Sequence, residues 1–328
     1  MQGWRLVMSP SSSGGRKVIQ DFGYISTESG TVHQWSVLAT DNAIYFFDMN
    51  KRKMFRYTGK TEPLSDMKGL SAFFANKFVG EIITTDNPIE RTGITATYDR
   101  RFSEALFTFH DRTGPFGESD YSFTSFTVGF NEFISAYSSF YSFTPTIYIN
   151  DGKKILTPKM PNLSIYSLDP PNGHLLYLHN SGDYGKFYDT LYSSSIDIVV
   201  NPYPTEIKVF DNVTFHTETY DGDLQKQNET YSNIRFYNDY QNTDWIALTP
   251  TTTVKRAERE WQMPVARNKV LDPAVDLFAS ANIDSAGAIT YKDRIRDKYM
   301  IVNFKYDNVS NRRTILHYLK TLLRISPR

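Results

Sequence analysis

The sequence predicts an all-β protein built from antiparallel hairpins that repeat like the blades of a β-propeller. The first observation is the stretch 43–58, AIYFFDMNKRKMFRYT, which is apolar, turns at 49–53 and becomes apolar again. The second is that looser versions of this strand–turn–strand pattern recur at 105–113, 146–156 and 174–188. The third is an aromatic content of 15%, with 22 Tyr and 23 Phe, side chains that suit pleated, half-buried surfaces. Hairpins repeated along a chain are typical of radial β architectures.

Composition and charge exclude several classes of protein. Lys plus Arg and Asp plus Glu each number 36, so no strong field attracts nucleic acid or an anionic membrane. The chain has no cysteine, which excludes disulfides and thiolate metal sites. Its first residues, MQGWRLVMSPSSSGG, lack the apolar centre of a signal peptide. No run approaches the roughly 20 apolar residues of a membrane helix, so we expect no membrane partner.

Residues 1–190 are expected to form the propeller-like hairpin region. Asn150–Gly152 is a strong hairpin turn, because Asp-Gly accommodates the positive φ angles that such a turn requires. The stretch 131–143 is rich in Ser and aromatic residues and is predicted to be mostly strand. The other predicted strands of this region lie at 18–26, 32–39, 44–48, 53–58, 94–99, 104–110 and 125–130.

One stretch of this region departs from the strand pattern. Ser65 and Asp66 can cap the start of a helix, and five apolar residues then follow a period near 3.6. Gly69 weakens this helix because glycine lowers helix propensity. We expect one short amphipathic helix near 65–80, with its apolar face formed by Met67, Leu70, Phe73, Phe74 and Phe78.

Residues 191–328 are expected to form a second β region that either completes the propeller or packs on it. The stretch 300–306 has the cleanest alternation, with Met300, Val302, Phe304 and Tyr306 on one face. The last stretch, 314–326, is predicted as a strand, although its leucines would also fit a helix. Further strands are expected at 195–200, 205–210, 213–220 and 234–237. The stretch 249–268 is charged and less periodic, and 269–288 is loop-like.

Two patterns bear on metal binding. His174 and His179 with Asp183 are the nearest approach to a transition-metal set, but a spacing of five in a strand directs the two imidazoles to opposite faces. Residues 221–223, DGD, resemble the start of a Ca²⁺ loop, yet Ser232 stands where that loop needs a bidentate Glu. Solvated histidines and a plain polar loop are the simpler interpretations, so no metal or cofactor is predicted.

No motif indicates catalysis. The chain has no GxSxG, Walker or GxGxxG sequence. Propellers do host glycosidases, which need two carboxylates, so a carbohydrate-binding or glycoside-hydrolysing propeller is the alternative function. Asp99, Glu104 and Asp111 are acids in this region, but turn and strand-edge positions explain them equally well. We predict no enzyme and no catalytic residue.

Basic residues gather at a few turns and at the end of the chain. Lys51–Lys53 and Arg100–Arg101 lie in predicted turns. Lys255, Arg256 and Arg259 alternate with Glu258 and Glu260, which is typical of a solvated face. The end of the chain is locally basic and could face phosphate in a DNA conduit, through Arg312, Arg313, Arg324 and Arg328. The neutral net charge argues against specific DNA recognition.

Several strings, in order, resemble the tail nozzle proteins of crAss-like podoviruses, which are called muzzle or stabilisation proteins. They cover nearly the whole chain from about Gly14, and their order is more specific than any one of them. They read GRKVIQDFGYIS, NAIYFFDMNKRKMFRYTG, PLSDMKGLSAFF, YDRRFSEALFTF, FNEFISAYSSFYSFTPTIYINDGKKIL, NPYPTEIKVFDNV, DRIRDKYMIVNFKYDN and TILHYLKTLLRISPR.

This resemblance implies a structural virion protein that contains a propeller and belongs to the tail. It implies a ring of copies, six by resemblance, below the portal and adaptor, with neighbouring tail and adaptor proteins as partners. The ring would form part of the conduit for DNA ejection and contact viral DNA transiently and non-specifically. Members of the family are much longer, so the chain corresponds to a C-terminal portion: a fragment, a split gene product or a processed piece. An N-terminal portion on another chain is then a further expected partner, and the protein would be made in the cytoplasm of a host bacterium.

Overall fold

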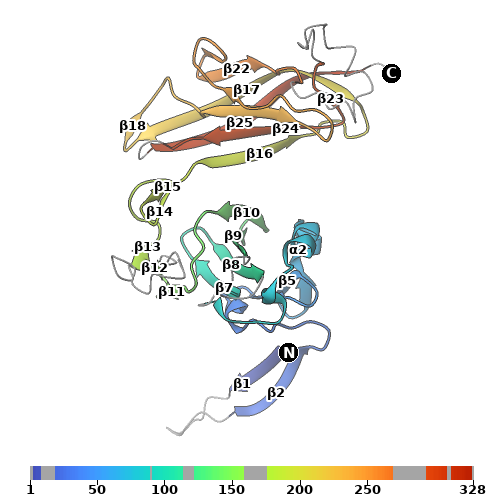
Figure 1. Ribbon diagram of the computed structural model, residues 1–328, viewed down its shortest axis with the longest axis vertical. Coiled ribbons are helices and arrows are strands. Elements are labelled where there is room, and N and C mark those ends of the chain that lie inside the picture. Colours follow the sequence, from blue (N-terminus) through green and yellow to red (C-terminus); the bar gives the residue numbers. More distant parts are fainter. Residues whose placement is uncertain are drawn as a thin grey trace. The chain divides into compact units, whose positions relative to one another are not determined.

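The protein, seen here as a computed structural model, consists of two compact units, Met1–Ser181 and Gly182–Arg328 (Figure 1). The structure describes residues 3–8, 19–88, 91–113, 122–158, 176–268, 293–308 and 312–326. These residues form mostly β-strands, and every strand pairing among them is antiparallel. Among them, no helix combines the length and the apolar character needed to cross a bilayer.

The first unit contains four sheets, a few short helices and no parallel strand pairs among its described residues. The sheet orders are β1-β2, β3-β4-β5-β6, β10-β9-β8-β7 and β11-β12-β13. The elements are β1 (Gly3–Met8), β2 (Ile19–Ser26), η1 (Gln34–Ser36), β3 (Leu38–Ala39), β4 (Ile44–Asp48), β5 (Lys53–Tyr57), β6 (Thr61–Pro63), α1 (Leu64–Lys68), α2 (Ser71–Lys77), η2 (Glu81–Ile83), β7 (Gly93–Asp99), β8 (Glu104–Thr113), β9 (Ser122–Asn131), β10 (Ala136–Tyr141), β11 (Ile149–Asn150), β12 (Ile155–Pro158) and β13 (Leu176–Leu178).

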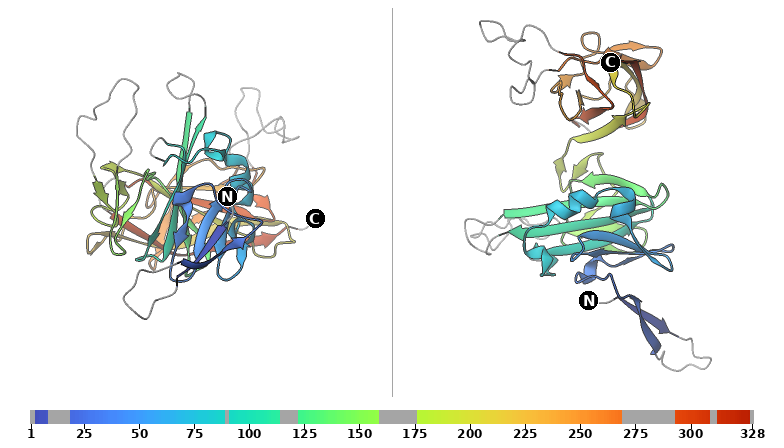
Figure 2. Two further views of the ribbon diagram at one scale, coloured as in Figure 1. Left: turned by 90° about the horizontal axis from the view of Figure 1, so that it is seen from below. Right: turned by 90° about the vertical axis from the view of Figure 1, so that its right-hand side faces the viewer.

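An aromatic core joins β4 and α2 to one face of the β7–β10 sheet. Alternation along β8 places Phe107 and Phe109 on this face, and both are fully buried. Phe47 of β4 lies 4.9 Å from Phe109, ring centre to ring centre, and 5.1 Å from Phe74 of α2. The rings meet mostly edge to face, the arrangement that aromatic quadrupoles favour. Figure 2 (right) shows the helices lying over the strands of this unit.

The opposite face of the same sheet is polar and is covered by residues 143–150. Thr108 and His110, the alternate residues of β8, point to this side and are fully buried. Thr108 Oγ1 lies 2.6 Å from the Tyr148 hydroxyl, and His110 Nε2 lies 2.9 Å from the carbonyl of Pro145. Because both faces are covered, β8 is buried along most of its length, as expected of the middle layer of three.

The second unit places two sheets face to face. The sheet orders are β16-β24-β19-β20 and β18-β17-β22-β21, and β17 also pairs with β23 and β25. The elements are β14 (Lys186–Phe187), β15 (Thr190–Leu191), β16 (Ser194–Val200), β17 (Lys208–Asp221), β18 (Leu224–Gln225), β19 (Asn233–Tyr237), β20 (Ile246–Ala247), β21 (Lys255–Ala257), β22 (Glu260–Pro264), β23 (Arg296–Asp297), β24 (Met300–Tyr306) and β25 (Arg312–Ile325).

The core of the second unit lies between these two sheets. Phe215 of β17 contacts Phe304 of β24 with 4.9 Å between ring centres, which joins the sheets across the core. The predicted alternation at 300–306 is confirmed, because Met300, Val302 and Phe304 are fully buried. The strand prediction for 314–326 is also confirmed, since this stretch lies in β25 and pairs with β17 along almost its full length (Figure 1).

The expected propeller-like blades are not found among the described residues. The hairpin at 43–58 and the turn at Asn150–Gly152 are confirmed, with Gly152 at a φ of 86°. The stretch 105–113 is instead a single strand within β8, because Asp111 continues the ladder with β9 opposite Thr124. The described part of the last string, 176–188, is not a hairpin either: β13 pairs with β12, and β14 pairs with β15. Two of the four similar strings are therefore hairpins and two are not, and no radial repeat results among the described residues.

The predicted helix near 65–80 is two short helices. Gly69 has a φ of 87° and Leu70 a φ of 69°, and this left-handed backbone separates α1 from α2. The break allows Phe74 and Phe78 to be fully buried while Met67 remains exposed. The strand expected at 32–39 is also shorter than predicted, because Gln34–Ser36 form a 3₁₀ turn before β3. The loop predicted at 269–288 lies outside the described residues.

Candidate functional site

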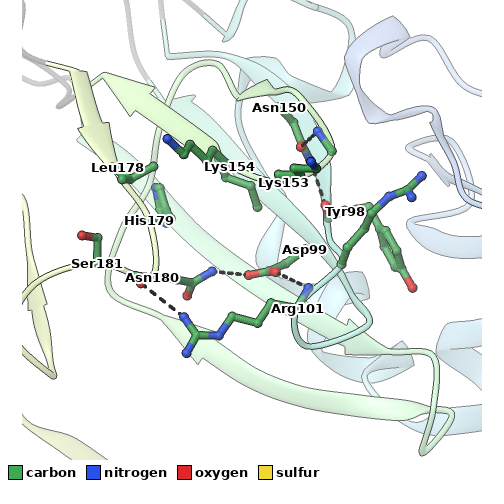
Figure 3. Close-up of a pocket in the computed structure, with 13 residues that line it drawn as sticks. Tyr98, Asp99, Arg101, Asn150, Lys153, Lys154, Leu178, His179, Asn180 and Ser181 are labelled. Atoms are coloured by element: carbon green, nitrogen blue, oxygen red, sulfur yellow. Dashed lines mark hydrogen bonds between the residues drawn. The ribbon is translucent and has the colours of Figure 1, made fainter.

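The candidate site is a basic cavity in the first unit, with a volume of about 260 Å³ (Figure 3). Three segments line it: the β7–β8 turn at 98–101, the β11–β12 turn at 150–155, and residues 178–181. Its charged lining residues are Asp99, Arg100, Arg101, Lys153 and Lys154. Four cations surround one carboxylate, so the cavity carries an excess of positive charge.

Asp99 ties two of these segments together. One carboxylate oxygen accepts a hydrogen bond from the backbone N–H of Arg101 at 2.9 Å, and the other accepts one from the side-chain amide of Asn180 at 2.7 Å. The Arg101 guanidinium in turn donates to the carbonyl of Asn180 at 3.3 Å (Figure 3). Asp99 is buried, and both of its oxygens are bound to the protein. It therefore positions the wall of the cavity rather than facing its contents.

The β11–β12 turn places two lysines at the opposite side. Asp151 Oδ1 accepts hydrogen bonds from the backbone N–H groups of Lys153 at 2.8 Å and Lys154 at 2.6 Å. Asn150 anchors the turn to β7 by donating to the carbonyl of Tyr98 at 2.8 Å. These bonds fix the backbone, and both ammonium groups remain on exposed side chains.

His179 also lines the cavity, but its imidazole ring carries no charge there. Its Nε2 lies 2.6 Å from the Thr157 hydroxyl, and its ring meets that of Phe143 edge to face. Burial lowers the pKa of His179, although the negative charge of Asp99 acts in the opposite direction. The ring is therefore neutral at pH 7 and serves as a hydrogen-bonding wall.

This arrangement suits binding of a small anion. Arg side chains recognise oxyanions through their planar fork, and Lys side chains add point charges. Glycoside hydrolysis needs two carboxylates that face one cavity. Asp99 is the one carboxylate among the lining residues, and its oxygens are already bound.

The histidine and acidic patterns noted in the sequence occupy other places. Asp183 forms an ion pair with Lys186 at 3.7 Å, while His179 is bound to Thr157. His174 lies outside the described residues. Residues 221–223 form the tight end of the β17–β18 hairpin, with Gly222 at a φ of 60°. The Asp221 carboxylate there lies within 4 Å of two cations, Lys226 and Arg312.

The two other carboxylates considered as catalytic candidates are structural. Asp111 accepts hydrogen bonds from the backbone N–H groups of Val79, Gly80 and Ile82, at 2.9–3.1 Å. It thereby fixes the segment after α2 to the end of β8. Glu104 accepts hydrogen bonds from the hydroxyls of Ser138 and Tyr141, which hold β10 against β8 and β9.

Most of the remaining basic residues noted in the sequence are paired. Lys53 binds Asp66 at 2.6 Å, and Arg52 donates to a carbonyl of α2. Arg256 lies over the ring of Trp261. Arg324 binds Asp211 through two hydrogen bonds, of 2.6 and 2.9 Å, and Arg312 binds Glu229. Arg328 lies outside the described residues.

Sequence reasoning missed the role of Lys153 and Lys154. A signal existed, because NDGKK at 150–154 places two lysines directly after a hairpin turn. In the fold this turn lies beside the Arg100–Arg101 turn, which is about 50 residues earlier in the chain. The sequence does not reveal this proximity, because it depends on how β11 is anchored to β7.

Two protein-family matches cover most of the chain, and the boundary between them falls where the two units meet in the sequence. Residues 12–160 match the family described as Crassvirus muzzle protein, and residues 182–268 match the Crassvirus muzzle protein C-terminal domain. The chain is also similar to the muzzle protein of Bacteroides phage crAss001, with 23% identity over 303 residues. This alignment covers 90% of the chain but 18% of that relative, so the chain spans less than a fifth of the relative's length.

Proposed function

We propose that this chain, which belongs to the Crassvirus muzzle protein family, is a structural component of a bacteriophage tail. The observation that carries the proposal is the pair of matches to the two muzzle domains, in chain order, over 12–160 and 182–268. The family implies no enzymatic role. The virion tail is the corresponding location.

In finer detail, the proposed role is a ring of copies held together by protein–protein contacts. The surface that supports it lies at one end of the β7–β10 sheet, where two turns meet. We call it the hairpin-tip patch and define it as Phe102, Phe133 and Ile134, which are 50%, 91% and 60% exposed. The turns are joined by hydrogen bonds from the Asn131 side chain to the Phe102 carbonyl and from the Glu132 N–H to the Ser103 carbonyl.

The proposed occupant of the hairpin-tip patch is a second copy of this chain. Three large apolar side chains on rigid turns favour burial against a partner, since contiguous exposed apolar surface marks interaction sites. A ring needs a heterologous contact, in which a patch on one copy meets a different surface on the next. The apolar tips supply one half of such a contact.

The test is the oligomeric state of the chain and of a Phe133→Ser/Ile134→Ser variant, measured by sedimentation velocity over a wide concentration range. We expect the unaltered chain to self-associate and the variant to shift its midpoint concentration upward by about 10-fold or more, since apolar anchors dominate interfaces. Tyr240→Ser is the matched control, because it removes a 72% exposed aromatic side chain from the second unit.

A strictly monomeric unaltered chain at high concentration, with no incorporation into tails, would overturn the proposed role. Equal self-association of the unaltered chain and the double variant would leave the tail role standing but would exclude the hairpin-tip patch as the contact. These outcomes separate the function from the surface proposed to perform it.

The proposed ring forms part of the conduit for DNA ejection and contacts neighbouring tail and adaptor proteins. A conduit must release DNA, so its surface should bind phosphate weakly. The equal numbers of acidic and basic residues support this, as do the ion pairs that engage Arg312 and Arg324. The basic cavity, with four cationic lining residues, is the proposed place of transient, non-specific phosphate contact.

Charge reversal tests the cavity's part in this role. In Lys153→Glu/Lys154→Glu, we expect the weak, salt-sensitive retardation of a DNA duplex to decrease at low ionic strength, because fewer counterions are released on binding. Lys51→Glu is the control, since Lys51 is an exposed turn lysine that lines a different cavity. Retardation that is unchanged in the double variant would exclude the cavity as a DNA contact.

A further inference from the structure

Two histidines and a glutamate come together on the outer face of the second unit, on the strands β17 and β25. Along β17, the residues Val213, Phe215 and Thr217 are buried in the core. His216 and Glu218 alternate with them and are only half-buried, so both point outward. A His-x-Glu sequence in a strand therefore places an imidazole and a carboxylate side by side on one face.

A β-bulge in β25 adds the third side chain. His216 pairs with Tyr318 but Thr217 pairs with Leu316, so His317 is an extra residue with no opposite partner in the ladder. Leu316 and Leu319 both pack against the core although they are three positions apart. Strict alternation would put these two on opposite faces. The bulge thus directs His317 to the outer face, where β17 presents His216 and Glu218.

The three potential ligand atoms lie within 4.8 Å of one another. The His317 Nε2 is 3.1 Å from a Glu218 oxygen, and the two imidazole rings are stacked with centres 4.7 Å apart. Ligand atoms in a tetrahedral zinc site lie roughly 3.3 Å apart, given bonds of about 2.0–2.1 Å. The His317 nitrogen and the Glu218 oxygen already have about this separation, and the His216 ring must rotate out of its stacked position for its nitrogen to join them.

The surroundings also resemble those of a metal site. The Tyr220 hydroxyl donates to Glu218 at 2.9 Å, which orients the carboxylate as an outer-shell partner does. The contact between His317 and Glu218 is by itself an ordinary contact of an imidazole with a carboxylate. The second imidazole is not needed for that contact, and its presence makes the set a two-histidine, one-carboxylate site.

We propose that His216, Glu218 and His317 bind one Zn²⁺ ion, with water in the fourth position. Two imidazole nitrogens and one carboxylate oxygen suit Zn²⁺, whereas Ca²⁺ and Mg²⁺ prefer all-oxygen sites. The ion joins β17 to β25 at the bulge, where the backbone ladder between the two longest described strands is interrupted. Its expected role is to brace the second unit at this point.

The first experiment is calorimetric titration of the untagged full chain with Zn²⁺. The second is thermal unfolding of the same full chain, in which the transition of the second unit is followed. We expect one Zn²⁺ per chain and a rise in the unfolding temperature of the second unit. Co²⁺ should report the coordination directly, through the visible absorption of a four-coordinate site with nitrogen ligands. His216→Ala and His317→Gln should each weaken Zn²⁺ binding by about 100-fold or more, beyond the roughly 10–100-fold typical of losing an outer-shell partner.

Tyr318→Phe is the matched control, because Tyr318 lies in the same bulge but its hydroxyl binds Glu260. It should bind Zn²⁺ as the unaltered chain does. Glu218→Gln keeps the shape of the side chain and removes its charge, so weakened binding in this variant would not result from misfolding. The proposal is wrong if the unaltered chain binds no stoichiometric Zn²⁺, or if binding survives unchanged in both histidine variants.

Discussion

The most highly connected acidic side chains of the two units have different kinds of partner, although the first unit also has ion pairs such as Lys53–Asp66 and Arg56–Glu62. In the first unit, Asp111 is buried and bound by three backbone N–H groups, and Glu132 accepts four hydrogen bonds from uncharged side chains. In the second unit, Asp211 lies between Arg294 and Arg324, and Glu229 is bound by Arg312. Acids with neutral partners stabilise a fold independently of salt, whereas exposed ion pairs are screened by it.

The histidines sharpen the contrast. His33 and His110 of the first unit are fully buried, and burial lowers the pKa of both. Burial also lowers the pKa of His179 in the same unit. The histidines of the second unit, His216 and His317, lie instead on its outer face. The first unit should therefore be the more sensitive to mild acid, and the second the more sensitive to salt.

The largest effect should come from opening the aromatic core of the first unit. Phe47 contacts the rings of Phe74, Phe78 and Phe109 and is fully buried, so Phe47→Ala should destabilise this unit by about 3–5 kcal/mol. Denaturant unfolding followed by hydrogen exchange in β8 and β24 would separate the two units. We expect β8 to lose protection and β24 to keep it.

The control for this prediction is Val79→Ala, since Val79 is 70% exposed in the same unit. It should change stability by less than about 0.5 kcal/mol. Equal loss of protection in both units after Phe47→Ala would show that the units unfold together, and the comparison between them would fail.

Mild acid should weaken the first unit next. Burial lowers the pKa of His110 to about 4, from the ordinary value of 6.5. A group with a depressed pKa in the folded state contributes stability above its unfolded pKa, and loses it as the pH falls. His110 alone should therefore cost the first unit about 2 kcal/mol between pH 7 and pH 5, at about 1.36 kcal/mol for each tenfold change.

The second unit should be stable over the same range of pH. Its carboxylates with lowered pKa, such as Asp211 next to Arg324 and Glu260 next to Lys320, lose their contribution only below their ordinary values near 4. Thermal unfolding at pH 7, 6 and 5 measures both units. His110→Gln should flatten the dependence of the first unit on pH; a slope that stays the same would exclude this histidine as its source.

A smaller effect is expected from Glu132, which joins β4 and the turn before it to β7. Burial raises its pKa, but the hydrogen bonds from Tyr98, Thr40, Tyr45 and Asn42 outweigh this and lower it. Glu132→Gln should cost about 1–3 kcal/mol, because a neutral amide with a single oxygen replaces a carboxylate that accepts four bonds. Chemical unfolding at pH 7 measures the loss, and it should shrink as the pH falls from the ordinary value of 4.5 through the lowered pKa of the folded carboxylate.

The smallest effect is expected from the surface network of the second unit. Asp211→Asn removes the charge that binds Arg294 and Arg324, whose side chains are 50% and 64% exposed. We expect a loss of stability well below that of Glu132→Gln, and its disappearance in about 1 M salt, where the Debye length falls to about 3 Å. A loss that does not depend on salt would mean that Asp211 acts through the backbone instead. It would contradict the expectation that the second unit is the more sensitive to salt.

Much of the secondary structure could be predicted from local patterns. The alternation in 300–306 identified β24, and the aromatic runs at 44–48 and 53–57 identified β4 and β5. Where two local signals conflicted, as in the leucines of 314–326, the strand prediction was correct. The repeat interpretation failed because strings of similar composition occupy different positions: 105–113 lies inside one strand, and 174–188 contributes to two sheets.

The candidate sites were much less predictable. The two lysines of the basic cavity and the two arginines opposite them are each visible in the sequence, but nothing local shows that they share a cavity. The three residues of the proposed zinc site are separated in the same way, since His317 is about 100 residues from His216. Only the extra residue in β25 turns His317 outward, and a bulge has no sequence signal here.

The sequence by itself determined most of the longer strands, several turns and the family that the chain is similar to, because these depend on side-chain alternation, turn residues and ordered strings. It did not indicate short strands such as β21 and β22. The tertiary structure alone decided which strands far apart in the chain pair. β16 pairs with β24 and β17 with β25, each across about 100 residues of chain. Period-two alternation states which face of a strand is apolar but not which other strand it meets. The choice of partner follows from burying both sheets against one core, a property of the whole unit and not of any segment.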